Sequence, residues 1–268
     1  MKKIIFLLIF IFLFQNSGNT KNTKFYIGSV YSGKIKYQFI EYELPAGEWE
    51  LYENITRIPF DEVPSIKIAW LLFVQTDKGT IKATYEIGEI NLGGFAPNQV
   101  GSFFVNEYKK GKYDSCILRP EYFYTNLYTK GGSSNCFLAR HLDVSKEMYF
   151  PDDPEDVGGR VKLEKYLKKN NLTLPKIMLG VGSSIFIPSI KDKGIFVGYW
   201  INPELFGAPK IINAKEEKSE YHRDNIDGFP IQKKFFTDWT IEQTLKHQEF
   251  EKKLRLRSHH KLDFSDLN

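Results

Sequence analysis

The sequence predicts an α+β fold: a mostly antiparallel, strand-rich body, a short helix near residues 160–170 and a longer C-terminal helix near residues 239–256. Runs of β-branched and aromatic residues, separated by turns rich in glycine and proline, recur through most of the chain. Only two stretches have the helical spacing of apolar residues, so strands and helices do not alternate as they do in a parallel α/β sheet. No internal repeat or linker divides the chain, and residues 21–268 are therefore predicted to form a single α+β domain.

The N-terminal residues predict export. Lys2 and Lys3 precede an unbroken apolar run at residues 4–14, and polar residues 15–22 follow it. This order is typical of a secretory signal peptide, and the run is shorter than the roughly 20 apolar residues that span a bilayer. We predict that residues 1–20 are a signal peptide and that the mature protein is periplasmic, with an uncleaved N-terminal anchor as the alternative. A lipoprotein anchor is excluded because no cysteine follows the run.

Composition narrows the range of partners. Of the 268 residues, 42% are hydrophobic and 15% aromatic, which is typical of a globular chain long enough to bury a sizeable core. The formal net charge is +4, and it falls to +2 without Lys2 and Lys3. Nucleic acid is not expected as a partner, since proteins that bind it usually carry a concentrated basic surface. Contact with a membrane is expected only through an uncleaved N-terminus.

Two hairpins are predicted in the N-terminal third. Residues 34–42 alternate in polarity, and Pro45 and Gly47 favour a turn before a return strand that begins at Trp49, which we expect in the core. Residues 65–76 and 80–87 flank a short turn that ends in Gly79. The first of these two strands is apolar on both faces and is therefore expected in the interior of the sheet.

Cys116 and Cys136 are the two cysteines of the chain, and the predicted oxidising destination favours a structural disulfide between them. The alternative is a reactive Cys136 with His141 as its base, which would require a lowered thiol pKa and a spatial arrangement that sequence spacing does not establish.

The glycines at residues 180–182 follow a short apolar stretch and suggest two kinds of site. A dinucleotide-binding motif needs a helix after its glycines, but residues 185–188 continue as extended chain. A nucleophile elbow needs the spacing G-x-S-x-G, and no glycine follows Ser183 at the required position. We therefore expect a glycine-loosened strand with a β-bulge.

The predicted centre of the sheet is at residues 195–201. This stretch has almost no polar side chain, is too short for a helix and is bounded by Gly194 and Pro203. Such a run is typical of a strand that is buried on both faces. Pro203 has no backbone N–H to donate, so we expect the strand to end there.

The C-terminal part begins with a charged loop at residues 215–227 that contains the lone His222. Thr237 and Asp238 are predicted to cap the long helix that follows. Acidic residues at 151–156 are predicted to precede the shorter helix rather than to bind a cation, because the EF-hand spacing is missing.

Four segments together resemble a loose set of uncharacterised exported proteins of proteobacteria. They are residues 44–49, the cysteine pair with Asn135, residues 199–204 and residues 221–224. The resemblance implies a bacterial envelope setting and no particular activity.

The predicted function is that of a non-catalytic envelope protein that binds a partner protein or a ligand. No metal quartet, catalytic triad, phosphate-binding loop or carboxylate pair stands out, so we assign no catalytic residue, cofactor or metal. The alternative is a hydrolase of envelope material, with Ser183 or Cys136 as nucleophile and His141 or His222 as base.

The predicted disulfide has a measurable consequence. Closing a loop of about 20 residues stabilises a fold by roughly 3 kcal/mol in the chain-entropy model. The double variant Cys116→Ser/Cys136→Ser should therefore lose about 2–4 kcal/mol in urea unfolding, and reductant should reproduce the loss in the wild type. Alkylation of both cysteines under denaturing, non-reducing conditions would show that the bridge does not exist.

Overall fold

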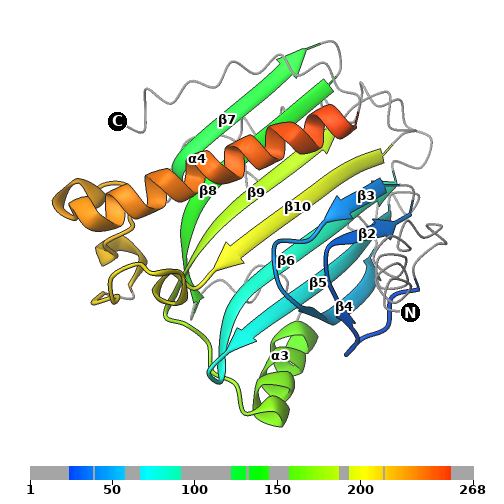
Figure 1. Ribbon diagram of the computed structural model, residues 1–268, viewed down its shortest axis with the longest axis horizontal. Helices are drawn as coiled ribbons and strands as arrows, with labels where there is room; N and C mark the ends of the chain where they lie inside the picture. Colours follow the sequence, from blue (N-terminus) through cyan, green and yellow to red (C-terminus); the bar gives the residue numbers. More distant parts are fainter. Residues whose placement is uncertain are drawn as a thin grey trace, which may run out of the picture.

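A computed structural model describes residues 24–38, 40–57, 67–91, 122–130, 133–144, 157–186, 193–213 and 215–254 (Figure 1). These residues form an eight-stranded sheet in the order β1-β4-β5-β6-β10-β9-β8-β7 and a separate two-stranded hairpin, β2-β3. All strand pairs are antiparallel. The α+β prediction is confirmed.

The strands are β1 Val30–Tyr31, β2 Lys34–Tyr37, β3 Ile40–Glu43, β4 Trp49–Arg57, β5 Lys67–Asp77, β6 Thr80–Asn91, β7 Tyr122–Lys130, β8 Ser133–Asp143, β9 Ile177–Phe186 and β10 Lys193–Ile201. The α-helices are α3 Val157–Asn170 and α4 Pro230–Lys253. Short 3₁₀ turns lie at η1 Pro203–Phe206, η2 Glu216–Lys218 and η3 Ile226–Gly228.

Strand β10 occupies the interior position that its sequence predicts, between β6 and β9. It ends at Ile201, and Pro203 begins η1, where the side chain of Asn202 accepts a hydrogen bond from the backbone N–H of Glu204 at 3.2 Å. Burial on both faces is not what the structure shows. On one face Ile195, Tyr199 and Ile201 are buried and Val197 is partly exposed. On the other face Phe196, Gly198 and Trp200 are partly exposed.

Two elements, α4 and the β2–β3 hairpin, cover the buried face of the sheet and are called its two covers below. Helix α4 lies over β8 and β9, and the β2–β3 hairpin lies over β4, β5 and β6 on the same face (Figure 1). Side chains from both covers and from alternate positions of the strands form one hydrophobic cluster, which includes Tyr42, Leu51, Phe73, Ile87, Leu179, Ile195 and Phe236. The main core therefore lies on one side of the sheet only, with α3 packed at one end of the other side against Leu142, Met178 and Trp200.

Local turns follow the sequence predictions. Lys78 and Gly79 both have positive φ, 49° and 75°, as a two-residue type I′ hairpin turn requires. Gly47 also has a positive φ of 111°. Trp49 is fully buried, and its indole N–H donates a hydrogen bond to the carbonyl of Pro45 at 2.7 Å, so the turn is held to the core by the side chain that follows it.

Helix α4 begins earlier than predicted. Its first residue is Pro230, which is suited to a first turn because its missing N–H would have no partner inside the helix. The predicted cap residue Asp238 instead lies in the helix interior, where its carboxylate accepts from Lys234 one turn earlier at 2.8 Å. The acidic segment predicted to precede α3 lies outside the described residues.

The predicted bulge at residues 180–182 is wrong. Strand β9 pairs with β8 and β10 without a register shift. Gly180 is needed for another reason: on the partly exposed face of the sheet, large rings of β10 and β9 lie over a glycine of the neighbouring strand. A Cβ on Gly180 would overlap the ring of Trp200, and one on Gly194 would overlap the ring of Phe186. The guanidinium of Arg140 lies 5.3 Å from the centre of the Trp200 ring and extends this row.

Two glycines of β9 provide a matched test. Gly180→Ala should destabilise the fold by about 1–3 kcal/mol, because the new methyl group must displace a packed ring. Gly182→Ala should be neutral or slightly stabilising, since its Cβ would meet Leu138 at an ordinary 3.7 Å. Urea unfolding of both variants checks this, and equal midpoints would contradict the assigned packing of Trp200.

Candidate ligand-binding pocket

A cavity of about 300 Å³ lies between the two covers and the sheet. Its floor comes from β6, β8, β9 and β10, one wall from β3 and the residues that follow it, and the other from the C-terminal half of α4. Three parts of the chain that are far apart in sequence thus enclose one site. The volume lies at the small end of the range found for ligand pockets.

The floor is aromatic and aliphatic. Tyr85 and Tyr199 are directly opposite each other on β6 and β10, with ring centres 6.1 Å apart. Val197 and Ser183 lie on the same face of β10 and β9, also directly opposite each other. Burial raises the pKa of both tyrosines above the usual range, with smaller contributions from the carboxylates of Glu43 at Tyr85 and of Glu242 at Tyr199. Both hydroxyls are therefore neutral at physiological pH.

Helix α4 contributes side chains at the three- and four-residue spacing that defines one helix face. These are Gln243, Lys246, His247, Phe250 and Lys253. Phe250 also packs against Tyr42 of the hairpin, with ring centres 5.6 Å apart. The same face of the helix therefore both lines the pocket and contacts the opposite wall.

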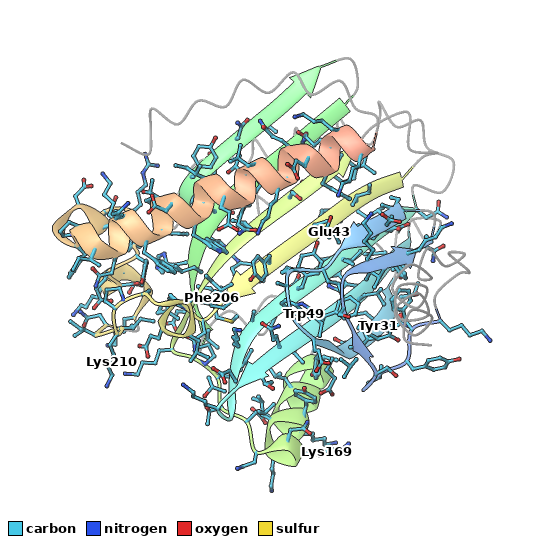
Figure 2. All side chains as sticks on the ribbon, in the orientation of Figure 1. Tyr31, Glu43, Trp49, Lys169, Phe206 and Lys210 are labelled. Carbon is cyan, nitrogen blue, oxygen red and sulfur yellow. The ribbon has the colours of Figure 1, made fainter. Side chains whose placement is uncertain are left out.

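The rim carries paired charges. Lys253 of α4 donates to Glu43 of β3 at 2.9 Å and joins the two covers, and Figure 2 labels Glu43 between them. This hydrogen bond and the charge of Lys253 lower the pKa of Glu43. Both side chains are more than half exposed, so the pair contributes little to stability and its importance is its position at the opening. Lys246 is similarly paired, with Glu242 at 2.6 Å.

His247 is held in place by two neighbours. One of its ring nitrogens lies 3.2 Å from the amide oxygen of Asn135 on β8 and 3.7 Å from the carboxylate of Glu251, one turn further along α4. Glu251 is only 2% exposed, and this burial raises its pKa to about 7. His247, Asn135 and Glu251 together form a polar contact between α4 and β8 beside the pocket.

The residues of the predicted hydrolase alternative are dispersed. Ser183 lines the pocket. His141 is fully buried on the same face, but it is four residues along β8 from Phe137, the partner of Ser183, which corresponds to about 13 Å. The ring of His222 lies 5.5 Å from that of His141, so the supposedly lone loop histidine contacts the sheet instead. Neither His141 nor His222 lies beside Ser183.

Cys136 is on the other side of the sheet from Ser183. It packs with Tyr122 and Leu138, and an odd number of positions along an unbroken strand separates it from His141. The two side chains therefore point to opposite faces, which does not favour the Cys136–His141 pair. Cys116 lies outside the described residues, and the disulfide stays a prediction.

Sequence reasoning did not identify His247. The available signal was the helical spacing of Gln243, His247 and Phe250, which predicts only that they share a face. What makes this face a pocket wall is the gap between α4 and the hairpin, and no local pattern specifies that gap.

Comparisons of the chain with protein-family models, curated proteins and solved structures find no match. Within the described ranges, no helix is long and apolar enough to cross a membrane. Nor do His, Cys, Asp and Glu side chains of that part of the chain form a group of three or more that could hold a metal ion.

The raised pKa of Glu251 predicts a pH-dependent stability. Its usual value is 4.5 and its value in the fold is about 7, so the native state retains a proton that the unfolded chain releases. The associated stabilisation is fully present below about pH 4.5 and is lost as the pH rises through about 7, with a total on the order of 3 kcal/mol.

Urea unfolding at pH 5 and pH 8 measures this effect. The glutamine of Glu251→Gln cannot ionise. The stability of this variant relative to the wild type should therefore increase as the pH rises from 5 to 8. The difference between the two proteins is the quantity of interest, because other groups titrate in both. A difference that does not change with pH would contradict the assigned burial.

Proposed function

We propose that this protein is a non-catalytic, exported protein of the bacterial cell envelope that binds a small ligand in the pocket between α4 and the β2–β3 hairpin. The observation that carries the proposal is the pocket itself: an apolar and aromatic floor, a rim of charged groups and walls from three parts of the chain. A folded chain that only filled its core would be expected to close such a space, because protein interiors are packed as densely as organic crystals.

The cellular setting of the proposal rests on the sequence. The basic, apolar and polar order at residues 1–22 supports export through a signal peptide at residues 1–20, with retention as an anchor as the alternative. The periplasm is the proposed compartment. The partner of the protein is proposed to be a small molecule rather than nucleic acid.

A hydrolase is the second candidate, and one observation favours it: Ser183 and His247 line the same pocket. His247 is moreover oriented by Asn135 and approached by Glu251, as the base of a catalytic triad is oriented by a third group. Against it, Ser183 lies within a regular strand and not on the exposed turn that nucleophilic serines of α/β-hydrolases occupy.

Two substitutions at Ser183 separate the candidates. Ser183→Phe fills the pocket, whereas Ser183→Ala removes only the hydroxyl. A fragment set of small amines, alcohols and carboxylates should contain binders by ligand-observed NMR. Their binding should be retained in Ser183→Ala and lost in Ser183→Phe, and a fluorophosphonate probe should label none of the three proteins.

The folded state of each variant is checked by circular dichroism and thermal unfolding. If Ser183→Phe does not fold, Val197→Phe fills the pocket from the adjacent strand β10 instead. Fluorophosphonate labelling that disappears in Ser183→Ala would establish the hydrolase. Fragment binding that both filled variants retain, or the absence of any binder, would overturn the binding function of this pocket.

A further inference from the structure

We infer that the pocket selects a small organic cation, an ammonium group that carries alkyl substituents, through its aromatic floor and its carboxylates. This inference rests on the proposed binding function and names the class of ligand. It follows from four properties of the lining that favour the same charge: the ring faces, the balance of ionised groups, the direction of α4 and the environment of the two tyrosines.

The first property is the aromatic content of the lining. Rings come from three strands and the helix: Tyr85 of β6, Phe137 of β8, Tyr199 of β10 and Phe250 of α4. The face of an aromatic ring is electronegative and attracts a cation within about 6 Å of its centre. Tyr85 and Tyr199 are inclined at 62° to each other in an edge-to-face arrangement, so their faces are not stacked on one another.

The second property is the balance of ionised groups. Three glutamates line the cavity, Glu41, Glu43 and Glu249, against two lysines, Lys246 and Lys253. Both lysines already donate to carboxylates, at 2.6 Å to Glu242 and 2.9 Å to Glu43. An anionic ligand would have to compete with these carboxylates for the ammonium groups. A cation meets the same competition at Glu41, which is paired with Lys34 at 3.0 Å, and at Glu43. Among the described residues, no lysine or arginine is paired with Glu249, which is therefore the carboxylate that a cation would meet first.

The third property is the direction of the helix. The part of α4 that lines the pocket is its C-terminal half, and Phe250 and Lys253 are in its last turn. The C-terminal end of a helix carries a partial negative charge, equivalent to about half an elementary charge. The backbone of α4 therefore adds to the attraction of a cation and opposes binding of an anion.

The fourth property is the environment of the tyrosines. The pKa of Tyr85 is raised by burial and then by Glu43, and the pKa of Tyr199 by burial and then by Glu242. The carboxylates at the rim thus act electrostatically on the floor. Burial, the larger cause, opposes any charge and carries no preference of sign. The smaller part of the shift, which comes from the carboxylates, reflects a negative potential at the floor, and this potential favours a positive ligand.

Three probes of nearly the same shape test the class of ligand. Choline carries a trimethylammonium group, 3,3-dimethylbutan-1-ol is its neutral isostere, and 3,3-dimethylbutanoate is an anion with the same branched end. Titrations of the full mature chain, followed by NMR, should give a dissociation constant for choline at least about tenfold lower than that for the alcohol. The carboxylate should bind more weakly than either.

Matched variants assign the effect to the lining. Tyr199→Phe keeps the ring and should keep the preference for choline over the alcohol, whereas Tyr199→Leu should reduce it several-fold. Glu249→Gln should weaken choline binding but not alcohol binding. Glu217→Gln, which removes an exposed carboxylate of η2 that does not line the cavity, serves as the control and should change neither.

The outcomes distinguish the preference for a cation from the binding function of the pocket. Equal affinities for choline and the alcohol, or tighter binding of the carboxylate, would overturn the cation preference and leave a binding pocket in place. Binding of choline that persists in Ser183→Phe and Val197→Phe would show that the cation binds elsewhere and would also overturn the inference. If none of the three probes binds the wild type while other fragments do, the ligand class is wrong and the binding function stands.

Discussion

The structure depends on an uninterrupted register across the four strands β6, β10, β9 and β8. Nine residue pairs join β10 to β6, eight join it to β9 and ten join β9 to β8, without a shift in any of the three. Since side chains alternate between faces, a slip of one residue in any of these pairings would exchange the faces of a whole strand. Tyr199 would then leave the core and Trp200 would enter it. The two faces are too different in content to allow this exchange.

The pocket follows from how the buried face is covered. One long helix and one short hairpin share this task, and they approach each other at Phe250 and Tyr42 and at the ion pair between Lys253 and Glu43. Neither element is wide enough to cover β9 and β10 alone. The space left between them is floored by the central strands, where the backbone is held most firmly by neighbours on both sides. A ligand site in this position combines a rigid floor with walls formed by separate elements.

Much of the fold was predictable because it is encoded locally. The hairpin turn at Gly79, the apolar run that ends before Pro203 and the core position of Trp49 all depend on a few neighbouring residues. The failures involve contacts distant in sequence. Gly180 suggested a bulge because the ring that requires it belongs to Trp200 on another strand. Asp238 has a side chain suited to a helix cap, whereas the true start of α4 at Pro230 follows Phe229 and has no capping side chain. His247 became a pocket residue only through the arrangement of α4, β8 and the hairpin.

The central pairing of the sheet also determines the order in which the molecule can form. Val197 and Ile87 face each other in the sheet but lie about 110 residues apart in the chain. Strands β4, β5 and β6 can form a meander early, but the β6 edge stays open until β10 arrives, and the face of the sheet stays uncovered until α4 docks. A topology dominated by such distant contacts folds slowly, and its open edge is exposed to pairing with other chains meanwhile. The protein is therefore more vulnerable to aggregation before α4 has docked than at any later stage.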